Sequence, residues 1–264
     1  MVEPREYQFY NIGFFGYGEK GDFVPWSIWH FIPLLVIAAA IILIWRYRKQ
    51  LRNWKNEKRF RYVFAFVMLL AEMSYFWRIL YVGNEWGLST LLDKLPLQIC
   101  QWGLICAVFA LLTESDALFG INFFVTICLT MPALFVPSVL TFTGPQYFRY
   151  YQYWLEHGLP LIAVFYLMFV RGKRPKYRHL WLSIGMLMLL SIPCVIANRT
   201  IPDANYMYLG NYAEGSTQTV DPLSFLPGSQ VVRYLIMMAL AIGLFHLLYA
   251  VYKFIERRRK QKRS

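Results

Sequence analysis

Seven long apolar runs restrict the fold of this chain more than any other feature of its sequence. Several of them reach the roughly 20 residues that an α-helix needs to cross a bilayer. Only helices and closed barrels satisfy their backbone hydrogen bonds in lipid, and these runs are too long for barrel strands. The sequence therefore predicts an all-α, polytopic membrane protein with seven transmembrane helices in one bundle. The expected spans are 26–45, 62–82, 95–113, 118–136, 154–170, 180–198 and 230–252.

The composition agrees with this fold class and predicts a single membrane domain. Of the 264 residues, 58% are hydrophobic and 16% are charged, whereas soluble domains carry roughly a quarter charged residues. No hydrophilic stretch is long enough to build a second core. We therefore expect an N-terminal interfacial segment at 1–25, a transmembrane domain at 26–252 and a basic cytoplasmic tail at 253–264.

The distribution of basic residues predicts the orientation of the bundle. Of the 27 Lys and Arg residues, 20 fall in segments on one side of the predicted membrane and five on the other. Cytoplasmic loops carry such an excess, so the N-terminus is expected outside and the C-terminus in the cytoplasm. Because the positive charge lies beside apolar ends, the net charge of +12 indicates contact with anionic inner-leaflet lipids through the basic loops. It does not indicate nucleic-acid binding.

A thiol and an imidazole are expected at the same depth near the outer face. Cys100 lies about five residues, or roughly 8 Å, below the outer end of span 95–113, in which Pro96 is expected to occupy the first turn. His157 lies within about one turn of the outer end of span 154–170. We therefore expect Cys100 and His157 to meet.

Other polar side chains share this outer layer and are candidates for binding or orienting a substrate. A polar or charged group inside a membrane needs a partner or a wet cavity. Arginines at such positions can also snorkel to the headgroups, and a histidine can simply bond a neighbouring helix. The role of Glu72, in mid-span, stays open. The candidates are His30, Arg78, Gln98, Gln101, Asn198, Asn205 and Arg233.

The pairing of Cys100 with His157 predicts nucleophilic chemistry on a lipid ester. An adjacent imidazole converts an inert thiol to a reactive thiolate, and Arg78 or Arg233 would hold a phosphate or stabilise an oxyanion. The expected intermediate is an acyl thioester on Cys100, resolved by a lysolipid, another acceptor or water. The sequence holds no HExxH motif, P-loop or dinucleotide turn, and its cysteines lack metal-ligand spacing, so no metal or soluble cofactor is expected.

Six motifs, in order along the chain, carry a resemblance to a known family. They are WSIWH, LPLQIC, EHGLPLIAVFYL, RGKRPKYRH, ANYMYL and DPLSFLPGS. With them the chain resembles the YwaF-like integral membrane proteins, whose eukaryotic relatives include a transmembrane acyltransferase acting on ether phospholipids. The resemblance implies that Cys100 of LPLQIC is the nucleophile and His157 of EHG the base. It also implies phospholipids and lysophospholipids as partners, and a multi-pass protein of the bacterial plasma membrane.

The leading hypothesis is a membrane acyltransferase or transacylase that moves an acyl chain from a phospholipid through a Cys–His dyad near the outer leaflet. Three alternatives stay open. The polar cluster could be the ligand site of a transporter or lipid-binding protein, although no internal repeat supports an inverted-repeat transporter. The same dyad could serve a lipid hydrolase. The protein could also be a non-catalytic assembly or sensor protein.

Overall fold

The computed structural model describes residues 23–86, 95–137, 144–201, 204–209 and 230–261, and the side chains of 78–86 and 230 lie outside this description. Within these ranges every regular element is a helix, so the all-α prediction is confirmed for the described part. The predicted interfacial segment at 1–25 lies almost wholly outside it.

The long helices are α1 (Ile28–Arg46), α3 (Glu57–Trp86), α5 (Ile99–Thr113), α6 (Asp116–Val125), α8 (Phe148–Phe169), α9 (Tyr177–Thr200) and α10 (Gln230–Gln261). The short ones are α2 (Arg48–Arg52), the π-helix η2 (Thr126–Thr130), α7 (Pro132–Phe135) and the 3-10 helix η4 (Tyr206–Tyr208).

Five helical segments of the described residues are long and apolar enough to cross a membrane. They belong to α1, α3, the continuous run from α6 to α7, α9 and α10. The two other predicted spans fall short for different reasons. Helix α5 is apolar but has 15 residues, and α8 carries Arg149, Gln152, Glu156 and His157 in its first half. The chain is thus a multi-pass membrane protein, and the seven-span topology stays a prediction.

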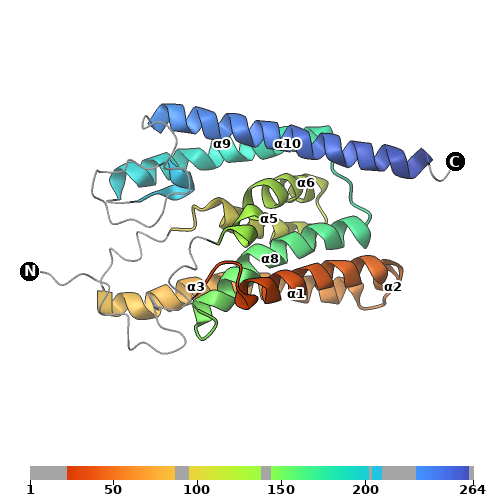
Figure 1. Ribbon diagram of the computed structural model, residues 1–264, viewed down its shortest axis with the longest axis horizontal. Coiled ribbons are helices and arrows are strands. Elements are labelled where there is room, and N and C mark those ends of the chain that lie inside the picture. Colours follow the sequence, from red (N-terminus) through yellow and green to blue (C-terminus); the bar gives the residue numbers. More distant parts are fainter. Residues whose placement is uncertain (1–22, 87–94, 138–143, 202–203, 210–229, 262–264) are drawn as a thin grey trace, which may run out of the picture.

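Helices α5, α6 and α8 lie in the middle of the molecule, as Figure 1 shows. Helix α8 packs against α1, α3 and α5, while α6 packs against α5 and α9. Fully buried side chains such as Leu104, Phe124 and Tyr166 join these helices in one apolar core. The outer helices bury far less, since α1 buries only His30 and Ile37. This pattern is typical of a bundle whose outer helices turn apolar side chains to lipid.

Three helix starts differ from the predicted ones by four residues or more. Helix α5 begins at Ile99, because the backbone N–H of Gln98 donates to Gln101 Oε1 (3.2 Å) and caps the helix there. The prediction that Pro96 occupies the first turn is therefore wrong. Helix α3 begins at Glu57 instead of residue 62, and α8 begins at Phe148 instead of residue 154.

Helix α10 continues beyond its predicted end at residue 252. It runs to Gln261, so the predicted tail 253–264 is helical as far as it is described. Lys253 and Glu256, one turn apart, pair at 2.8 Å in this extension. A basic helix end is also favoured by the helix dipole.

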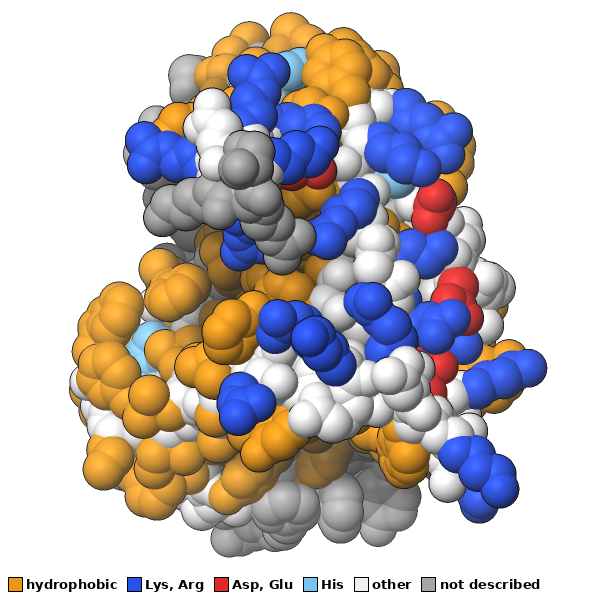
Figure 2. All heavy atoms as spheres, turned by 90° about the vertical axis from the view of Figure 1, so that its right-hand side faces the viewer, with side chains coloured by type: hydrophobic (Ala, Val, Ile, Leu, Met, Phe, Trp, Pro, Cys, Tyr) orange, Lys and Arg blue, Asp and Glu red, His pale blue; other side chains and the backbone are white. Residues whose placement is uncertain are grey.

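Lysine and arginine side chains gather at one end of the bundle, which Figure 2 shows face-on. Those that point inward are paired. Arg61 contacts Glu57 (3.2 Å) and Glu114 (2.7 Å), and Arg171 contacts Glu114 (2.7 Å). Burial opposes the charged form of Arg171, but the hydrogen bond and charge of Glu114 raise the pKa of the guanidinium. These ion pairs tie the start of α3 to the α5–α6 turn and the end of α8.

We expect Arg61→Leu to destabilise this end of the bundle by about 3 kcal/mol. The Arg61 side chain is 4% exposed, and its loss removes the closest cation from the buried Glu57 and one of two cations from the half-buried Glu114. The measurement is the midpoint of thermal unfolding of the purified protein in detergent. Arg59→Leu is the matched control, because Arg59 is exposed and belongs to the same helix. Equal midpoints for both variants would contradict a stabilising role of the ion pairs.

Candidate functional site

Cys100 and His157 line one cavity of about 500 Å³. The cavity lies between α5, η2, α7, α8, α9, η4 and α10, at the end of α5 opposite the ion pairs of Glu114. Most of its lining is apolar, and its polar lining residues come mainly from α5 and α8. No hydrogen bond joins Cys100 to His157 among the described contacts. The polar lining residues are Gln98, Cys100, Arg149, Tyr153, Glu156, His157, Tyr208 and Tyr234.

Cys100 is the second residue of α5, in the turn whose N–H groups have no partner within the helix. This end of a helix stabilises negative charge and hence a thiolate. Gln98 lines the cavity, and its Oε1 accepts from the backbone N–H of Met207 in η4 (3.4 Å). Gln101 is 5% exposed and caps the helix. The two glutamines therefore position the helix start, and only Gln98 borders the cavity.

The Thr130 hydroxyl lies within interaction range of the Cys100 thiol. It is fully buried and forms no hydrogen bond among the described residues. Gly103 lies one turn after Cys100, and a Cβ at that position would be 3.3 Å from Thr130 Oγ1. The absence of a side chain at Gly103 thus lets η2 approach α5. The hydroxyl is free to donate to a thiolate when one forms.

We expect Thr130→Val to slow the alkylation of Cys100 by a small maleimide about tenfold. Valine keeps the shape of threonine but removes the donor, and hydrogen bonds to charged groups contribute about 1.5–3 kcal/mol. The rate is measured by mass spectrometry of the Cys100 peptide, which excludes the other cysteines. Thr126→Val is the control, because the Thr126 hydroxyl donates to Asn122 Oδ1 (2.6 Å) instead. An unchanged rate in Thr130→Val would show that the hydroxyl does not act on the thiol.

The His157 ring is held in one tautomer. Its Nδ1 lies 2.9 Å from the carbonyl oxygen of Tyr153, and because a carbonyl only accepts, Nδ1 carries the proton. In the neutral ring Nε2 is then unprotonated and can accept a proton. The Tyr153 ring packs against His157 in a tilted arrangement with centroids 4.2 Å apart, and its hydroxyl donates to the Ala133 carbonyl (2.6 Å). The imidazole is therefore fixed in the form that a general base needs.

An arginine–glutamate pair outside the predicted site residues also lines the cavity. Arg149 Nη1 lies 3.1 Å from Glu156 Oε2, and its guanidinium lies 4.5 Å from the centroid of the Tyr75 ring. Gln152 donates to the same Glu156 oxygen at 3.2 Å. Seven residues separate Arg149 from Glu156, which places them on one face of α8. Because the helix was predicted to begin at residue 154, Arg149 was expected in a loop, and its helical spacing from Glu156 was not recognised.

Glu72 of α3 forms a buried polar group with side chains from α5 and α8. It is 4% exposed, and neither carboxylate oxygen makes a hydrogen bond among the described residues. The polar side chains that interact with its carboxylate are those of Glu156, Arg149 and Gln101. Glu72 does not itself line the cavity. It therefore belongs to the polar surroundings of Glu156, behind the cavity wall.

His30 does not line the cavity, although its depth predicted a place there. It is fully buried, its Nδ1 accepts from the Trp26 backbone N–H (3.0 Å), and its Nε2 donates to the Leu134 carbonyl (2.8 Å). The ring also packs against Trp154, with centroids 5.5 Å apart. Nε2 thus ties α1 to α7, while Nδ1 holds the turn that precedes α1. The hypothesis that His30 orients a substrate has no support in this geometry.

The other predicted site residues lie around the cavity or outside the description. The Asn198 side chain donates to the Tyr206 carbonyl (3.0 Å) and accepts from its N–H (2.7 Å), which fixes η4 over the cavity. Asn205 immediately precedes η4, and Arg233 is a buried residue of α10. Neither lines the cavity. The side chain of Arg78 lies outside the described residues.

The helical architecture, with five segments able to cross a membrane, places this chain among the polytopic membrane proteins. Its sequence matches the TMEM164 family over residues 25–261, which is nearly the whole chain. The chain therefore belongs to the TMEM164 family, a family of membrane proteins. No curated protein and no solved structure matches it.

Proposed function

We propose that this protein is a membrane acyltransferase or transacylase that takes an acyl chain from a phospholipid onto Cys100. The observation that carries the proposal is the placement of Cys100 and His157 on one apolar-walled cavity. A relation to the ether-phospholipid acyltransferases, suggested by the LPLQIC and EHG motifs, supports the same chemistry. With the predicted orientation, the donor is a lipid of the outer leaflet.

The first half-reaction transfers the acyl group to sulfur. His157 Nε2 takes the proton of Cys100, and the thiolate attacks the carbonyl carbon of the lipid ester. The ester C–O bond breaks, and the departing lysophospholipid oxygen takes the proton from His157. An acyl thioester remains on Cys100. The N-terminal turn of α5 offers backbone N–H groups to the developing oxyanion.

The second half-reaction moves the acyl group to an acceptor. The hydroxyl of a lysolipid gives its proton to His157, and its oxygen attacks the thioester carbonyl. The C–S bond then breaks, and the thiolate regains the proton from His157. If water replaces the lysolipid, the same steps give a fatty acid, and the protein is a hydrolase. The resting geometry has no Cys100–His157 hydrogen bond, so substrate binding must bring the two groups together.

The remaining cavity residues suit an acyl lipid. Among the described lining residues Arg149 is the cation available to a lipid phosphate, a role predicted from the sequence for Arg78 or Arg233. The apolar wall includes Leu187, Met237 and Met238. Flexible methionines adapt to chains of varied shape. The pair with Glu156 keeps the Arg149 charge compensated until a phosphate arrives.

A lipid-binding or transport function without chemistry is the second candidate, favoured by the missing hydrogen bond between Cys100 and His157. An assay in vesicles separates the candidates. The reconstituted protein is given a phospholipid with a labelled acyl chain and an unlabelled lysophospholipid. Label in a new diacyl lipid indicates a transferase, and label in free fatty acid indicates a hydrolase. Binding of the labelled lipid without either product would contradict the proposal and favour a lipid-binding protein.

A further inference from the structure

Two groups of cations at the basic end of the bundle differ in their partners. The inward ones are compensated, since Arg61 and Arg171 contact buried or half-buried carboxylates and Lys173 contacts Asp116 (2.7 Å). The second group lies where α3 begins and consists of Lys55, Lys58 and Arg59. All three are exposed and have no acidic partner among the described residues. Their charge is therefore available to an anion from outside the protein.

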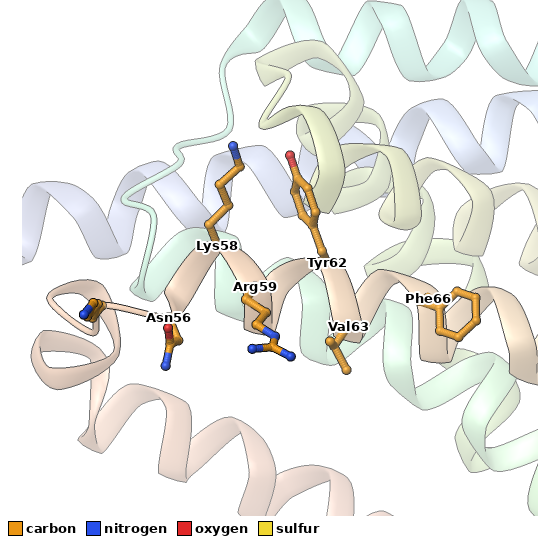
Figure 3. A pocket seen from close by; sticks show the side chains of 7 residues that line it. Asn56, Lys58, Arg59, Tyr62, Val63 and Phe66 are labelled. Carbon is orange, nitrogen blue, oxygen red and sulfur yellow. The ribbon is translucent and has the colours of Figure 1, made fainter.

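These three cations border a shallow surface pocket of about 560 Å³ on α3 (Figure 3). Lys58 and Tyr62 project on one side of the helix, while Arg59 and Val63 project on the other. Phe66 follows further along. The apolar members of the pocket are well exposed, with exposed fractions of 42% for Tyr62, 53% for Val63 and 59% for Phe66. The pocket thus changes from basic to apolar along the helix.

The order of these side chains matches the layers of a membrane. Helix α3 is able to cross a bilayer from Glu57 onward, so its exposed apolar face turns to acyl chains. From Arg59 to Phe66 the helix rises about 10 Å. The polar layer on each side of the hydrocarbon core is about 5–7 Å thick. A phosphate at the level of Lys58 and Arg59 therefore has its acyl chains at the level of Phe66.

We propose that this face of α3 binds an anionic phospholipid of the adjacent leaflet. Lys58 and Arg59 hold the phosphate from two sides, and Lys55 adds a third charge that favours an anionic headgroup over a zwitterionic one. An acyl chain lies along Val63 and Phe66. An acidic peptide does not fit this face, because the apolar residues belong to a membrane-crossing segment. This site is independent of the cavity of Cys100 and of the proposed acyl transfer.

The test is native mass spectrometry of the delipidated full-length protein in detergent, titrated with phosphatidylglycerol or phosphatidylcholine. The variant Lys55→Gln/Lys58→Gln/Arg59→Gln removes the three charges. The control Arg257→Gln/Arg258→Gln/Arg259→Gln removes three exposed charges from the end of α10. We expect the first variant to bind phosphatidylglycerol about tenfold more weakly, with phosphatidylcholine binding little changed. The control is expected to bind phosphatidylglycerol as the parent protein does.

Two further variants test the apolar part and the identity of the ligand. Phe66→Ser is expected to weaken phosphatidylglycerol binding severalfold, and Leu35→Ser, a change at an equally lipid-exposed position of α1, is expected to leave it unchanged. Soluble glycerol phosphate is expected not to displace the bound lipid. An equal loss in both triple variants would overturn the proposal, because it would place the binding elsewhere than on this face of α3. Displacement by glycerol phosphate would also overturn it, because it would show that the acyl chains do not contribute to binding.

Discussion

Replacing Cys100 with alanine is expected to reduce phospholipid acyl transfer at least about a thousand-fold. The variant keeps the cavity and its apolar walls but removes the atom that carries the acyl group. Losses of this size are typical when a covalent nucleophile is removed, because binding and charge stabilisation alone leave little catalysis. The measurement is the rate of labelled acyl transfer in reconstituted vesicles, with the amount of folded protein checked by size-exclusion chromatography.

Cys128 provides the matched control for this experiment, since it lines the same cavity. Its sulfur faces the Leu244 carbonyl oxygen (3.7 Å) from within the π-helix, and it lacks the helix N-terminus that Cys100 has. We expect Cys128→Ala to keep at least half of the activity. The opposite ranking of the two variants would show that Cys128, and not Cys100, carries the acyl group.

His157→Gln is expected to lower acyl transfer about a hundred-fold while leaving the thiol in place. Glutamine keeps hydrogen-bonding groups near the ring position but cannot accept a proton as Nε2 does. General base catalysis contributes roughly 10²–10⁴-fold in enzymes, and the expected loss lies at the lower limit of this range. The variant is compared with the parent at saturating lipid, so that a change in turnover is separated from a change in binding.

His30→Gln is the control for the histidine prediction. His30 is buried like His157, but both of its nitrogens bond protein groups, Trp26 and Leu134, and it does not line the cavity. We expect this variant to unfold at a lower temperature and to keep its turnover per folded molecule. A hundred-fold loss in His30→Gln, with His157→Gln active, would exchange the assigned roles of the two histidines.

The sequence predicted the apolar helices well, because an apolar run long enough to cross a bilayer can satisfy its backbone hydrogen bonds only as a helix or in a closed barrel. The predicted helix ends differ from the observed ones where polar side chains determine the residue at which a helix begins. The capping of α5 by Gln98 and Gln101 displaces Pro96 from the first turn, and the polar start of α8 resembles a loop by hydropathy alone. Helix α8 is central in the structure and packs against α1, α3 and α5. A half-polar helix can therefore lie inside the bundle, a position that hydropathy does not distinguish from a loop.

Residue counting predicted that Cys100 and His157 lie at one level of the bundle, but it did not predict the directions in which the side chains point. Cys100, His157 and His30 share one layer by residue count, yet only the first two line the cavity. In a soluble protein the apolar face of a helix marks the core, but here both lipid and core are apolar. The sequence therefore does not show which neighbouring helix the His30 side chain of α1 faces. Arg149 was missed because its helix starts six residues earlier than predicted.

The most direct test of the account is a search for an acyl thioester on Cys100. Purified protein is incubated with a labelled phospholipid in the absence of acceptor, quenched in acid, digested and analysed by mass spectrometry. The account predicts an acyl adduct on the Cys100 peptide that hydroxylamine removes and that is absent in His157→Gln at early times. Labelled lipid turned over by the parent protein with no adduct on Cys100 would contradict it.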